Sequence, residues 1–262
     1  MTLAPSVLVT GASTGIGAAY AQRFAARGHG LVLVARDMAR METLAARLRQ
    51  ENGVSVDILQ ADLTRPAELA TVEARLSDDA RIGVLINNAG TALGGSFIEQ
   101  SPDEVARLVA INTTAPLRLA SAVAPRLARA GEGAIVNIGS VVGLAPEFGM
   151  TVYGATKAFM LFLSQGLNLE LGPKGVYVQA VLPATTRTAI WDHVGTDVSA
   201  LSYVMEVDDL VDAAMVVFDR REAVTIPPLP DVGQWDVLQA ARQAMLPNYR
   251  NRLPAERYRM HA

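Results

Sequence analysis

The sequence has no cysteine among its 262 residues. Disulfides, thiolate metal sites and a cysteine nucleophile are therefore excluded, and the absence fits a reducing compartment. Histidine is also scarce, since the chain has only His29, His193 and His261, which lie far apart. They match no spacing typical of metal ligands, so no metal site is expected.

Long apolar runs are missing as well. No stretch approaches the roughly 18 apolar residues that span a bilayer, and residues 1–10 lack a basic segment followed by a long apolar one. Lys and Arg number 23 against 26 Asp and Glu, so the basic excess typical of a nucleic-acid binder is absent. We therefore expect a soluble, cytoplasmic protein with no membrane and no nucleic-acid partner.

Half of the residues are hydrophobic and 19% are charged, which is the balance of a folded globular protein. Short apolar runs alternate with longer segments of helical spacing. We expect strands at residues 6–10, 31–35, 54–59, 83–87, 134–138, 176–182 and 223–226. Such alternation predicts the α/β class, with a doubly wound parallel sheet of about seven strands and helices on both faces. The length fits a single domain over residues 1–262.

The helical segments lie between these strands. We expect helices at residues 15–27, 38–50, from Pro66 onward, about 102–130, 153–171, 207–219 and 235–245. The segment 102–130 is long, and Pro116 and Pro125 are expected to bend or divide it.

A glycine-rich turn joins the first strand to the first helix, with the sequence Thr10-Gly11-Ala12-Ser13-Thr14-Gly15-Ile16-Gly17. Glycines let the backbone approach a pyrophosphate, and the helix N-terminus offers free N–H groups and a positive dipole end. An ordinary tight turn is the alternative, but the place between strand and helix favours a phosphate site. The expected cofactor contacts here are Gly11, Ser13, Thr14, Gly15, Ile16 and Gly17.

The spacing T-G-x-x-x-G-x-G resembles that of the short-chain dehydrogenase/reductase family, in its branch of about 250 residues. The resemblance extends over about residues 5–226. It implies a Rossmann fold, a nicotinamide dinucleotide, hydride transfer between CH–OH and C=O groups, and a homodimer or homotetramer. An epimerase or dehydratase is a further possibility, although such relatives tend to have another glycine spacing and a longer substrate domain.

The end of the second strand distinguishes between cofactors. An acidic residue here often accepts hydrogen bonds from the ribose 2′-OH, but Arg36 follows the strand and precedes Asp37. A guanidinium suits a 2′-phosphate, and the resemblance implies NADP(H), with Ser13 also within reach of the phosphate. The alternative is that Arg36 is a solvated charge and Asp37 caps the next helix.

The resemblance implies further cofactor contacts at three later strand ends. Asp62 and Leu63 resemble an adenine-contacting pair, although Asp62 is also a common turn residue. The sequence N-N-A-G closes the fourth strand, and a segment resembling P-G-x-x-x-T follows the sixth and is expected to contact the nicotinamide carboxamide. The contacts in these two segments are Asn88, Ala89, Gly90, Pro183, Thr186 and Thr188. Ala184 stands where glycine is usual, which leaves the local backbone path open.

Tyr153 and Lys157 are four residues apart on a predicted helix, so they share one face. A free tyrosine has a pKa of about 10, and a nearby ammonium lowers this pKa. Such a tyrosine can give a proton to a carbonyl oxygen as hydride arrives, or take the proton of an alcohol. The alternative is an ordinary surface pair. The resemblance also makes both residues cofactor contacts.

Ser140 lies thirteen residues before Tyr153, just past the fifth strand. Its hydroxyl can hold the substrate oxygen beside the tyrosine, or it is a structural turn hydroxyl. The resemblance implies that Asn112 supports a water chain through Lys157, while the alternative is that it satisfies a helix backbone group. Together Asn112, Ser140, Tyr153 and Lys157 match the catalytic set of the family.

Residues 189–205 carry several apolar side chains and are expected to form a lid over an apolar pocket. The alternative is ordinary packing of a helical excursion. A lid of this kind suggests a hydrophobic small-molecule carbonyl or alcohol as substrate. A tail begins at residue 227 and ends in several arginines, which suggests contact with a partner subunit. A non-catalytic dinucleotide-binding sensor or interaction protein on the same fold is the alternative function.

Overall fold

A computed structural model describes residues 4–195 and 197–259 of the chain. Contacts between residues divide the chain into two compact units, Met1–Pro227 and Pro228–Ala262. The tail expected from residue 227 corresponds to the second unit, and the single domain over residues 1–262 stays a prediction. Thr196 of the predicted lid and His261 lie outside the described residues.

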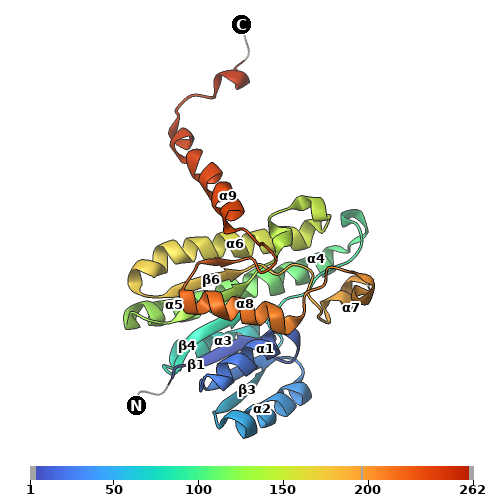
Figure 1. Cartoon of the computed structure of the whole chain (residues 1–262), viewed down its shortest axis with the longest axis vertical. Helices are drawn as coiled ribbons and strands as arrows, with labels where there is room; N and C mark the ends of the chain where they lie inside the picture. Colours follow the sequence, from blue (N-terminus) through green and yellow to red (C-terminus); the bar gives the residue numbers. More distant parts are fainter. Residues whose placement is uncertain (1–3, 196, 260–262) are drawn as a thin grey trace. The chain divides into compact units, whose positions relative to one another are not determined.

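The first unit is built on a seven-stranded parallel sheet (Figure 1). The strands are β1 Ser6–Thr10, β2 Leu31–Ala35, β3 Val56–Gln60, β4 Ile82–Asn87, β5 Ala134–Ile138, β6 Tyr177–Val181 and β7 Val224–Thr225. Their order is β3-β2-β1-β4-β5-β6-β7, which confirms the predicted doubly wound sheet. The chain reverses its winding direction between β1 and β4, and ligands of such sheets bind at this switch point, beyond the carboxyl ends of the strands.

Helices cover both faces of the sheet. One face carries α1 Gly15–Ala26, α2 Met38–Asn52 and α8 Val207–Arg220, and the other carries α3 Pro66–Asp78, α5 Ala115–Ala130 and α6 Thr151–Leu171. Side chains of a strand alternate between the faces, so Val7 and Val9 enter the first core while Leu8 enters the second. Burial on both faces explains why the central strands are continuous apolar runs.

The structure divides the long helix that the sequence predicts over residues 102–130. It consists of α4 Pro102–Val109, a π-helical turn at Ala110–Thr114, and α5. Pro116 has no N–H for the carbonyl four residues earlier, and its ring would collide with that carbonyl in a regular helix. The wide turn just before Pro116 relieves this conflict, whereas Pro125 lies inside α5 without ending it.

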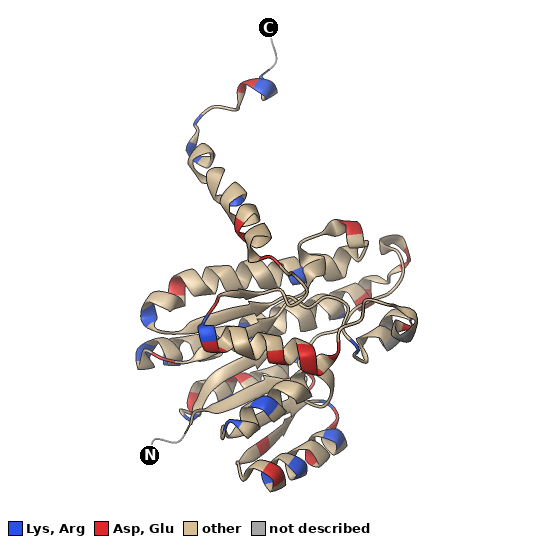
Figure 2. Ribbon diagram, in the orientation of Figure 1, with Lys and Arg blue, Asp and Glu red and all other residues tan. Residues whose placement is uncertain are grey.

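Ion pairs connect α1 to α8, and in Figure 2 basic positions on α1 and acidic positions on α8 are coloured on the ribbon. Arg23 lies 2.8 Å from Asp208 and 2.6 Å from Asp212, and Arg27 lies 2.7 Å from Asp219. Single exposed pairs contribute little, but this set shares one boundary between two helices. The pairs therefore help to fix α8 beside the helix that begins at the glycine turn.

Candidate active site

The turn after β1 needs glycine at defined positions. Gly11 and Gly15 have positive φ values of 64° and 54°. A Cβ atom added to Gly11 would lie 2.8 Å from Nδ2 of Asn88, and one added to Gly17 would lie 2.4 Å from the carbonyl oxygen of Gly11. The glycines thus let this turn pass close to the end of β4. Because these positions carry no side chains, the turn presents its backbone as a cradle for a ligand.

The first turn of α1 faces this cradle. Thr14 is the N-cap of the helix, and its side chain makes no capping hydrogen bond. The first N–H groups of a helix have no partner within the helix, so those after Thr14 are available to an anion. This arrangement fits the phosphates of a dinucleotide, with Ser13 and Ile16 half-buried beside it.

Thr10 fastens the ends of β1 and β4 to each other. Its Oγ1 accepts hydrogen bonds from the N–H groups of Asn88 at 2.9 Å and Ala89 at 3.0 Å, and donates to the carbonyl of Ile86 at 3.2 Å. In return, Nδ2 of Asn88 donates to the carbonyl of Thr10 at 2.9 Å and to that of Gly11 at 3.3 Å. Asn88 thus ties the backbone at the end of β1 to the end of β4. Sequence reasoning missed Thr10, whose signal is a buried hydroxyl residue directly before the glycine turn.

The end of β2 presents arginines to solvent. The Arg36 side chain is exposed, and among the described residues its guanidinium forms no ion pair. Asp37 caps α2 by accepting a hydrogen bond from the N–H of Arg40 at 3.0 Å, as the alternative interpretation of Asp37 stated. A cavity of about 450 Å³ adjoins this helix, and Ser13, Arg40 and Arg47 line it. The sequence analysis missed Arg40 and Arg47, whose signal is their seven-residue spacing along one helix face.

Asp62 and Leu63 follow β3. Oδ1 of Asp62 accepts hydrogen bonds from the N–H of Thr64 at 3.0 Å and from its hydroxyl at 2.7 Å, so the side chain closes a turn. The Leu63 side chain is buried in the core between the sheet and α3. Any contact of Leu63 with a cofactor must therefore come from its backbone.

Asn112 lies in the π-helical turn, with its side chain buried. Its Nδ2 donates to the carbonyl of Thr91 at 2.9 Å and to Oγ1 of Thr156 at 3.1 Å, and its Oδ1 accepts from the N–H of Thr91 at 3.0 Å. The side chain thus joins the loop after β4 to α6. Gly90 leaves room for this contact, because a Cβ there would lie 3.0 Å from Oδ1 of Asn112 and 3.7 Å from Nζ of Lys157.

Lys157 and Tyr153 lie on the same part of α6. Nζ of Lys157 is buried, donates to the carbonyl of Ile138 at 2.9 Å, and lies 5.5 Å from the centre of the Tyr153 ring. Burial lowers the pKa of Lys157 to about 8. Burial raises the pKa of Tyr153 to about 12, and a hydrogen bond with Ser140 opposes this rise.

The pKa of Tyr153 corrects the sequence analysis. We expected the neighbouring ammonium of Lys157 to bring the phenol pKa below its ordinary value of about 10. In the structure the pKa of Tyr153 rises instead. Burial removes the phenolate from water, and this unfavourable desolvation exceeds the stabilisation that the hydrogen bond with Ser140 provides. Burial also favours the neutral amine of Lys157 over its ammonium form, so the positive charge expected beside the phenol is less favoured.

Ser140 connects the loops after β5 and β6. Its Oγ accepts from the N–H of Val142 at 3.2 Å and donates to the carbonyl of Pro183 at 3.2 Å. The side chain thus has the structural turn role that we considered, and it also lies beside the phenol of Tyr153. Gly143 lets α6 approach this loop, since a Cβ there would lie 2.6 Å from the carbonyl carbon of Lys157.

The segment after β6 runs back toward the glycine turn. A Cβ added to Gly15 would lie 3.4 Å from the methyl group of Thr188, so the two segments face each other. The carbonyl of Thr186 accepts from Nε1 of Trp191 at 2.7 Å, and the Thr186 hydroxyl donates to the carbonyl of Ala184 at 3.0 Å. Among described non-glycine residues only Arg221 has a positive φ, so Ala184 fits where glycine is usual.

The predicted lid, residues 189–205, contains the short helix α7 Ile190–Val194 and a 3-10 turn at Val198–Ala200. A Cβ added to Gly94 would lie 2.6 Å from the carbonyl oxygen of Val194, so α7 lies against the loop after β4. The N–H of Met205 donates to the carbonyl of Thr185 at 2.9 Å, which closes the base of the segment. Large exposed apolar side chains surround this end of the sheet, namely Phe97, Ile98, Phe148 and Tyr203.

Within residues 4–195 and 197–259, every helix is too short or too polar to span a lipid bilayer. The same ranges hold no group of three or more acidic or histidine side chains that could bind a metal ion.

A model of the short chain dehydrogenase family matches residues 5–199. The chain belongs to this family, as the glycine turn and the Tyr153–Lys157 spacing predict. The seven-stranded sheet and the loops at its carboxyl edge therefore have the arrangement of short-chain dehydrogenases.

Two solved structures are very similar to this chain. A short-chain dehydrogenase from Sphingobium yanoikuyae, in complex with NADPH, is 66% identical, with a TM-score of 0.96 over 97% of this chain and 100% of the other. A bulky-bulky ketone specific alcohol dehydrogenase from Comamonas testosteroni is 59% identical, with a TM-score of 0.92 over 98% of this chain and 99% of the other.

Curated relatives are more distant. Human 17-beta-hydroxysteroid dehydrogenase type 3 is 32% identical over 73% of this chain, and the match spans only 62% of the relative's length. A 2,5-dichloro-2,5-cyclohexadiene-1,4-diol dehydrogenase from Sphingobium indicum is 31% identical over 88% of this chain and 95% of its own.

Proposed function

We propose that this protein is an NADP(H)-dependent oxidoreductase that moves a hydride between the nicotinamide and a ketone or secondary alcohol, with Tyr153 as general acid and base. The observation that carries the proposal is the meeting of Asn112, Ser140, Tyr153 and Lys157 beyond the carboxyl ends of β4 and β5, beside the glycine turn. The enzymatic activities named for the relatives favour this function over a non-catalytic sensor.

The glycine turn and the strand ends beside it would hold the cofactor. The N–H groups after Thr14 suit the pyrophosphate. Arg36 and Ser13 suit a 2′-phosphate, and Arg40 and Arg47 add positive charge to the adjoining cavity. The NADPH complex of the relative from Sphingobium yanoikuyae supports this choice of cofactor. The bound nicotinamide would supply or accept the hydride.

The side chains of the site would supply or take up the proton of the substrate oxygen. During reduction the carbonyl carbon gains a hydride, the C=O π pair moves to oxygen, and this oxygen takes the phenol proton of Tyr153. The hydrogen bond between Ser140 and Tyr153 supports a position for Ser140 next to the same oxygen, where its hydroxyl stabilises the developing charge. Oxidation of an alcohol follows the reverse steps.

Lys157 would help to position Tyr153 and to stabilise its phenolate. Its amine is fixed by the carbonyl of Ile138 and lies below the tyrosine ring. At neutral pH, below its pKa of about 8, most of the amine is protonated. The ammonium then favours the phenolate, which Tyr153 needs in order to take up the next proton. Asn112 holds the loop that borders the amine.

The substrate that fits best is a bulky apolar ketone or the corresponding secondary alcohol. Phe148 and Tyr203 are mostly exposed at the carboxyl edge of the sheet and offer apolar contact area. The relative from Comamonas testosteroni is a bulky-bulky ketone specific alcohol dehydrogenase, which supports this substrate class. A panel of ketones with small or large substituents, followed through NADPH consumption, tests this class. Preference for the smallest ketones would contradict it.

We further propose that the protein forms a homodimer or homotetramer in the cytoplasm. The outer face of α6 supports self-association, because Phe162 and Leu169 are 77% and 79% exposed there. Exposed large apolar side chains on one helix face are typical of subunit interfaces. Light scattering on the purified protein gives the mass of the assembly.

Replacement of Tyr153 tests the central proposal. A Tyr153→Phe variant keeps the ring but loses the acidic proton, so we expect unchanged NADPH affinity and a loss of turnover of at least a hundredfold. The matched control is Tyr258→Phe, which removes an exposed phenol from the second unit. Unchanged turnover of Tyr153→Phe would exclude this residue as the acid, and absence of NADPH binding to the natural chain would reject the cofactor.

A further inference from the structure

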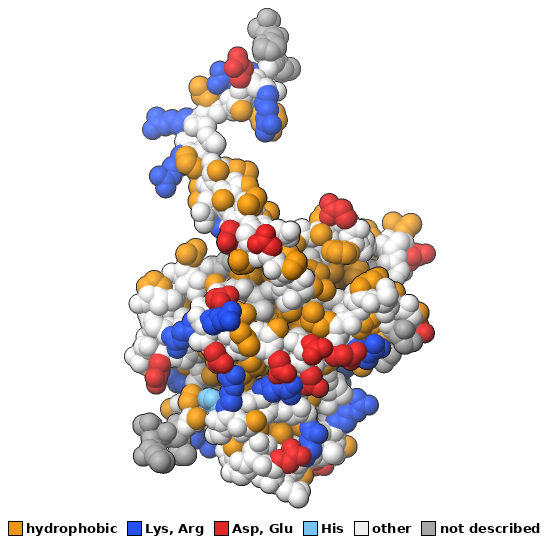
Figure 3. Space-filling model, viewed as in Figure 1, with side chains coloured by type: hydrophobic (Ala, Val, Ile, Leu, Met, Phe, Trp, Pro, Cys, Tyr) orange, Lys and Arg blue, Asp and Glu red, His pale blue; other side chains and the backbone are white. Residues whose placement is uncertain are grey.

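The second unit has almost no buried side chains among its described residues, 228–259. It consists of α9 Val232–Ala244 followed by 3-10 turns at Leu246–Arg250 and Glu256–Tyr258, and α9 has no buried residue. Figure 3 shows apolar side chains along the length of this unit. The large exposed ones are Val232, Val237, Leu238, Met245, Leu246, Tyr249, Leu253 and Tyr258.

Part of this apolar surface forms a stripe on α9. Trp235, Leu238, Ala241 and Met245 are spaced so that they share one side of a helix, and we call them the α9 stripe. Leu238 is 49% exposed and Met245 is 46% exposed. A helix of 13 residues is marginal in water unless tertiary or quaternary packing stabilises it. The stripe therefore requires a partner surface.

Acidic and basic residues are unevenly distributed along this unit: Asp231 and Asp236 lie in its first part, and the arginines follow from Arg242 onward, with Glu256 as the one acidic residue among them. Asp231 caps the start of α9 and accepts a hydrogen bond from the N–H of Gly233 at 2.8 Å. The other end carries Arg242, Arg250 and Arg252, and Figure 3 shows several basic side chains in this unit. Two copies in opposite directions would place each acidic start beside a basic end, and their helix dipoles would also oppose. Two parallel copies would place like charges together.

We infer that the α9 stripe packs against the same stripe of a second copy of this chain, with the two helices antiparallel. Such an interface is isologous, so each copy offers the same surface and the charges complement each other without a second kind of partner. The inference rests on the proposed homo-oligomer but not on the proposed reaction. It assigns one surface of the assembly to residues that the catalytic site does not use.

A charge placed in the stripe tests the inference. We expect Leu238→Asp to halve the mass of the assembly in light scattering, because each interface would bury two unpaired carboxylates. Gln243→Asp, on the opposite side of α9, is the matched control and should keep the natural mass. An assembly whose mass Leu238→Asp leaves unchanged would overturn the inference while the homo-oligomer stands. A natural chain that is monomeric would overturn both.

The absence of cysteine allows a second test that reports orientation. Ala241 lies near the centre of the stripe, so an antiparallel pair brings Ala241→Cys next to its own copy, within the 7 Å or so that a disulfide spans. Met245→Cys, at the end of the same stripe, would lie about 15 Å from its copy, since the α-helix rises about 1.5 Å per residue. Under mild oxidation we expect a covalent dimer from Ala241→Cys alone. Cross-links from both variants would indicate parallel helices, and none from either would indicate another partner surface; each result would overturn the inference.

Discussion

Nδ2 of Asn112 donates a hydrogen bond to Oγ1 of Thr156 at 3.1 Å, and this hydroxyl donates in turn to the carbonyl of Tyr153 at 2.7 Å. The two bonds connect the π-helical turn to the first turns of α6. Both Asn112 and Thr156 are buried, so water cannot replace either bond. The relationship makes Thr156, the residue just before Lys157, a positioning residue for the catalytic tyrosine.

Loss of the Thr156 hydroxyl should therefore slow catalysis. A Thr156→Val variant keeps the shape of the side chain but leaves a buried N–H of Asn112 without an acceptor, at a cost of about 1–3 kcal/mol. The displacement of Tyr153 or Asn112 that relieves this cost should lower kcat about tenfold or more. Steady-state kinetics measure the change. Thr156→Ser retains the hydroxyl and should restore most of kcat, and the NADPH Kd should be the same in both variants; equal kcat values for both would exclude the positioning role.

Removal of the Lys157 charge should stabilise the protein while it abolishes turnover. The pKa of Lys157 falls from 10.5 to about 8 on folding, a difference of about 3 kcal/mol at 1.36 kcal/mol per pKa unit. Loss of the hydrogen bond to Ile138 offsets about 1 kcal/mol. We therefore expect Lys157→Met to raise the free energy of unfolding by about 2 kcal/mol at pH 7.

The pH dependence of this gain has a defined sign. Because folding lowers the pKa of Lys157, the unfolded chain binds the proton more tightly between about pH 8 and 10.5. Below pH 8 the cost of the buried charge is fully present, and it disappears as the pH rises through this window. Denaturant unfolding of both proteins should show a gain from Lys157→Met that shrinks above pH 8. A gain that grows with pH would contradict the assignment.

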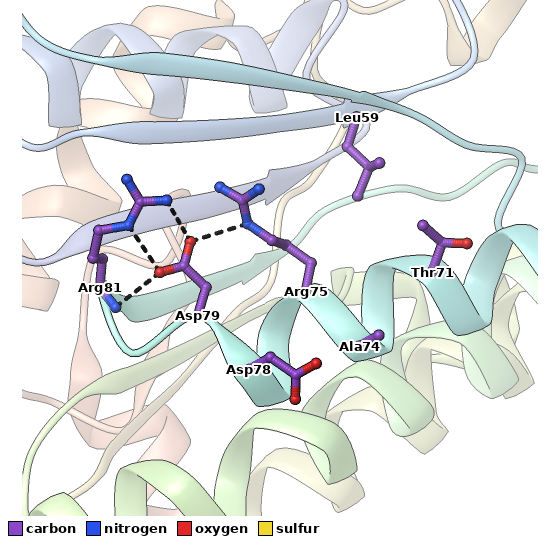
Figure 4. Close-up of a pocket in the computed structure, with 7 residues that line it drawn as sticks. All are labelled: Leu59, Thr71, Ala74, Arg75, Asp78, Asp79 and Arg81. Atoms are coloured by element: carbon purple, nitrogen blue, oxygen red, sulfur yellow. Dashed lines mark hydrogen bonds and ion pairs between the residues drawn. The ribbon is translucent and has the colours of Figure 1, made fainter.

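A charge cluster at the end of α3 should contribute to stability at neutral pH. Figure 4 shows Asp79 between the guanidinium groups of Arg75 and Arg81, at 3.0 Å and 2.7 Å. The hydrogen bond from Arg81 lowers the pKa of Asp79 to about 2. After allowance for screening around the exposed arginines, we expect Asp79→Asn to lower the free energy of unfolding by about 1 kcal/mol at pH 7.

This contribution should vanish in acid. Because folding lowers the pKa of Asp79, its stabilisation is present above the ordinary pKa of 3.8 and is lost as the pH falls toward about 2. The difference between Asp79→Asn and the natural chain should therefore close between pH 4 and pH 2 in denaturant unfolding. Asp78→Asn is the control, since this neighbouring carboxylate forms no ion pair with the two arginines. A difference that persists at pH 2 would refute the ionic origin.

Arg36 should set the preference for NADPH over NADH. Loss of its charge-assisted contacts with a 2′-phosphate is worth about 1.5–3 kcal/mol, so Arg36→Ala should weaken NADPH about tenfold to a hundredfold. NADH lacks that phosphate, and its Kd should change little. Fluorescence titration gives both constants, with the exposed Arg107→Ala on α4 as control. Equal weakening of the two cofactors would argue against a phosphate contact for Arg36.

Local spacing predicted most of the fold and of the candidate site. The apolar runs predicted each strand within one or two residues at its ends, because a parallel strand that is buried on both faces is mostly apolar. The glycine turn could be predicted from the sequence, because other residues do not fit its backbone. Positive φ values exclude them at Gly11 and Gly15, and the close approach of the backbone excludes them at Gly17. The four-residue spacing of Tyr153 and Lys157 fixed their common helix face.

Other features required contacts between distant parts of the chain. The clamp formed by Thr10 and Asn88 spans 78 residues, and the bond from Asn112 to Thr156 spans 44. Neither leaves a local pattern, because threonine and asparagine at such places are equally suited to turns and caps. The same holds for Arg40, whose place beside Ser13 depends on how α2 packs near the glycine turn.

The sequence by itself determined the alternation of strands and helices, the order of the motifs and the chemical groups available for catalysis, since these depend on residue type and spacing. Only the tertiary structure decided how those groups behave. Burial, which no spacing reveals, raises the pKa of Tyr153 and lowers that of Lys157. The widened turn before Pro116 directs Asn112 to Thr91 and Thr156. Both effects arise from desolvation and packing, which exist only when the folded chain brings remote segments together.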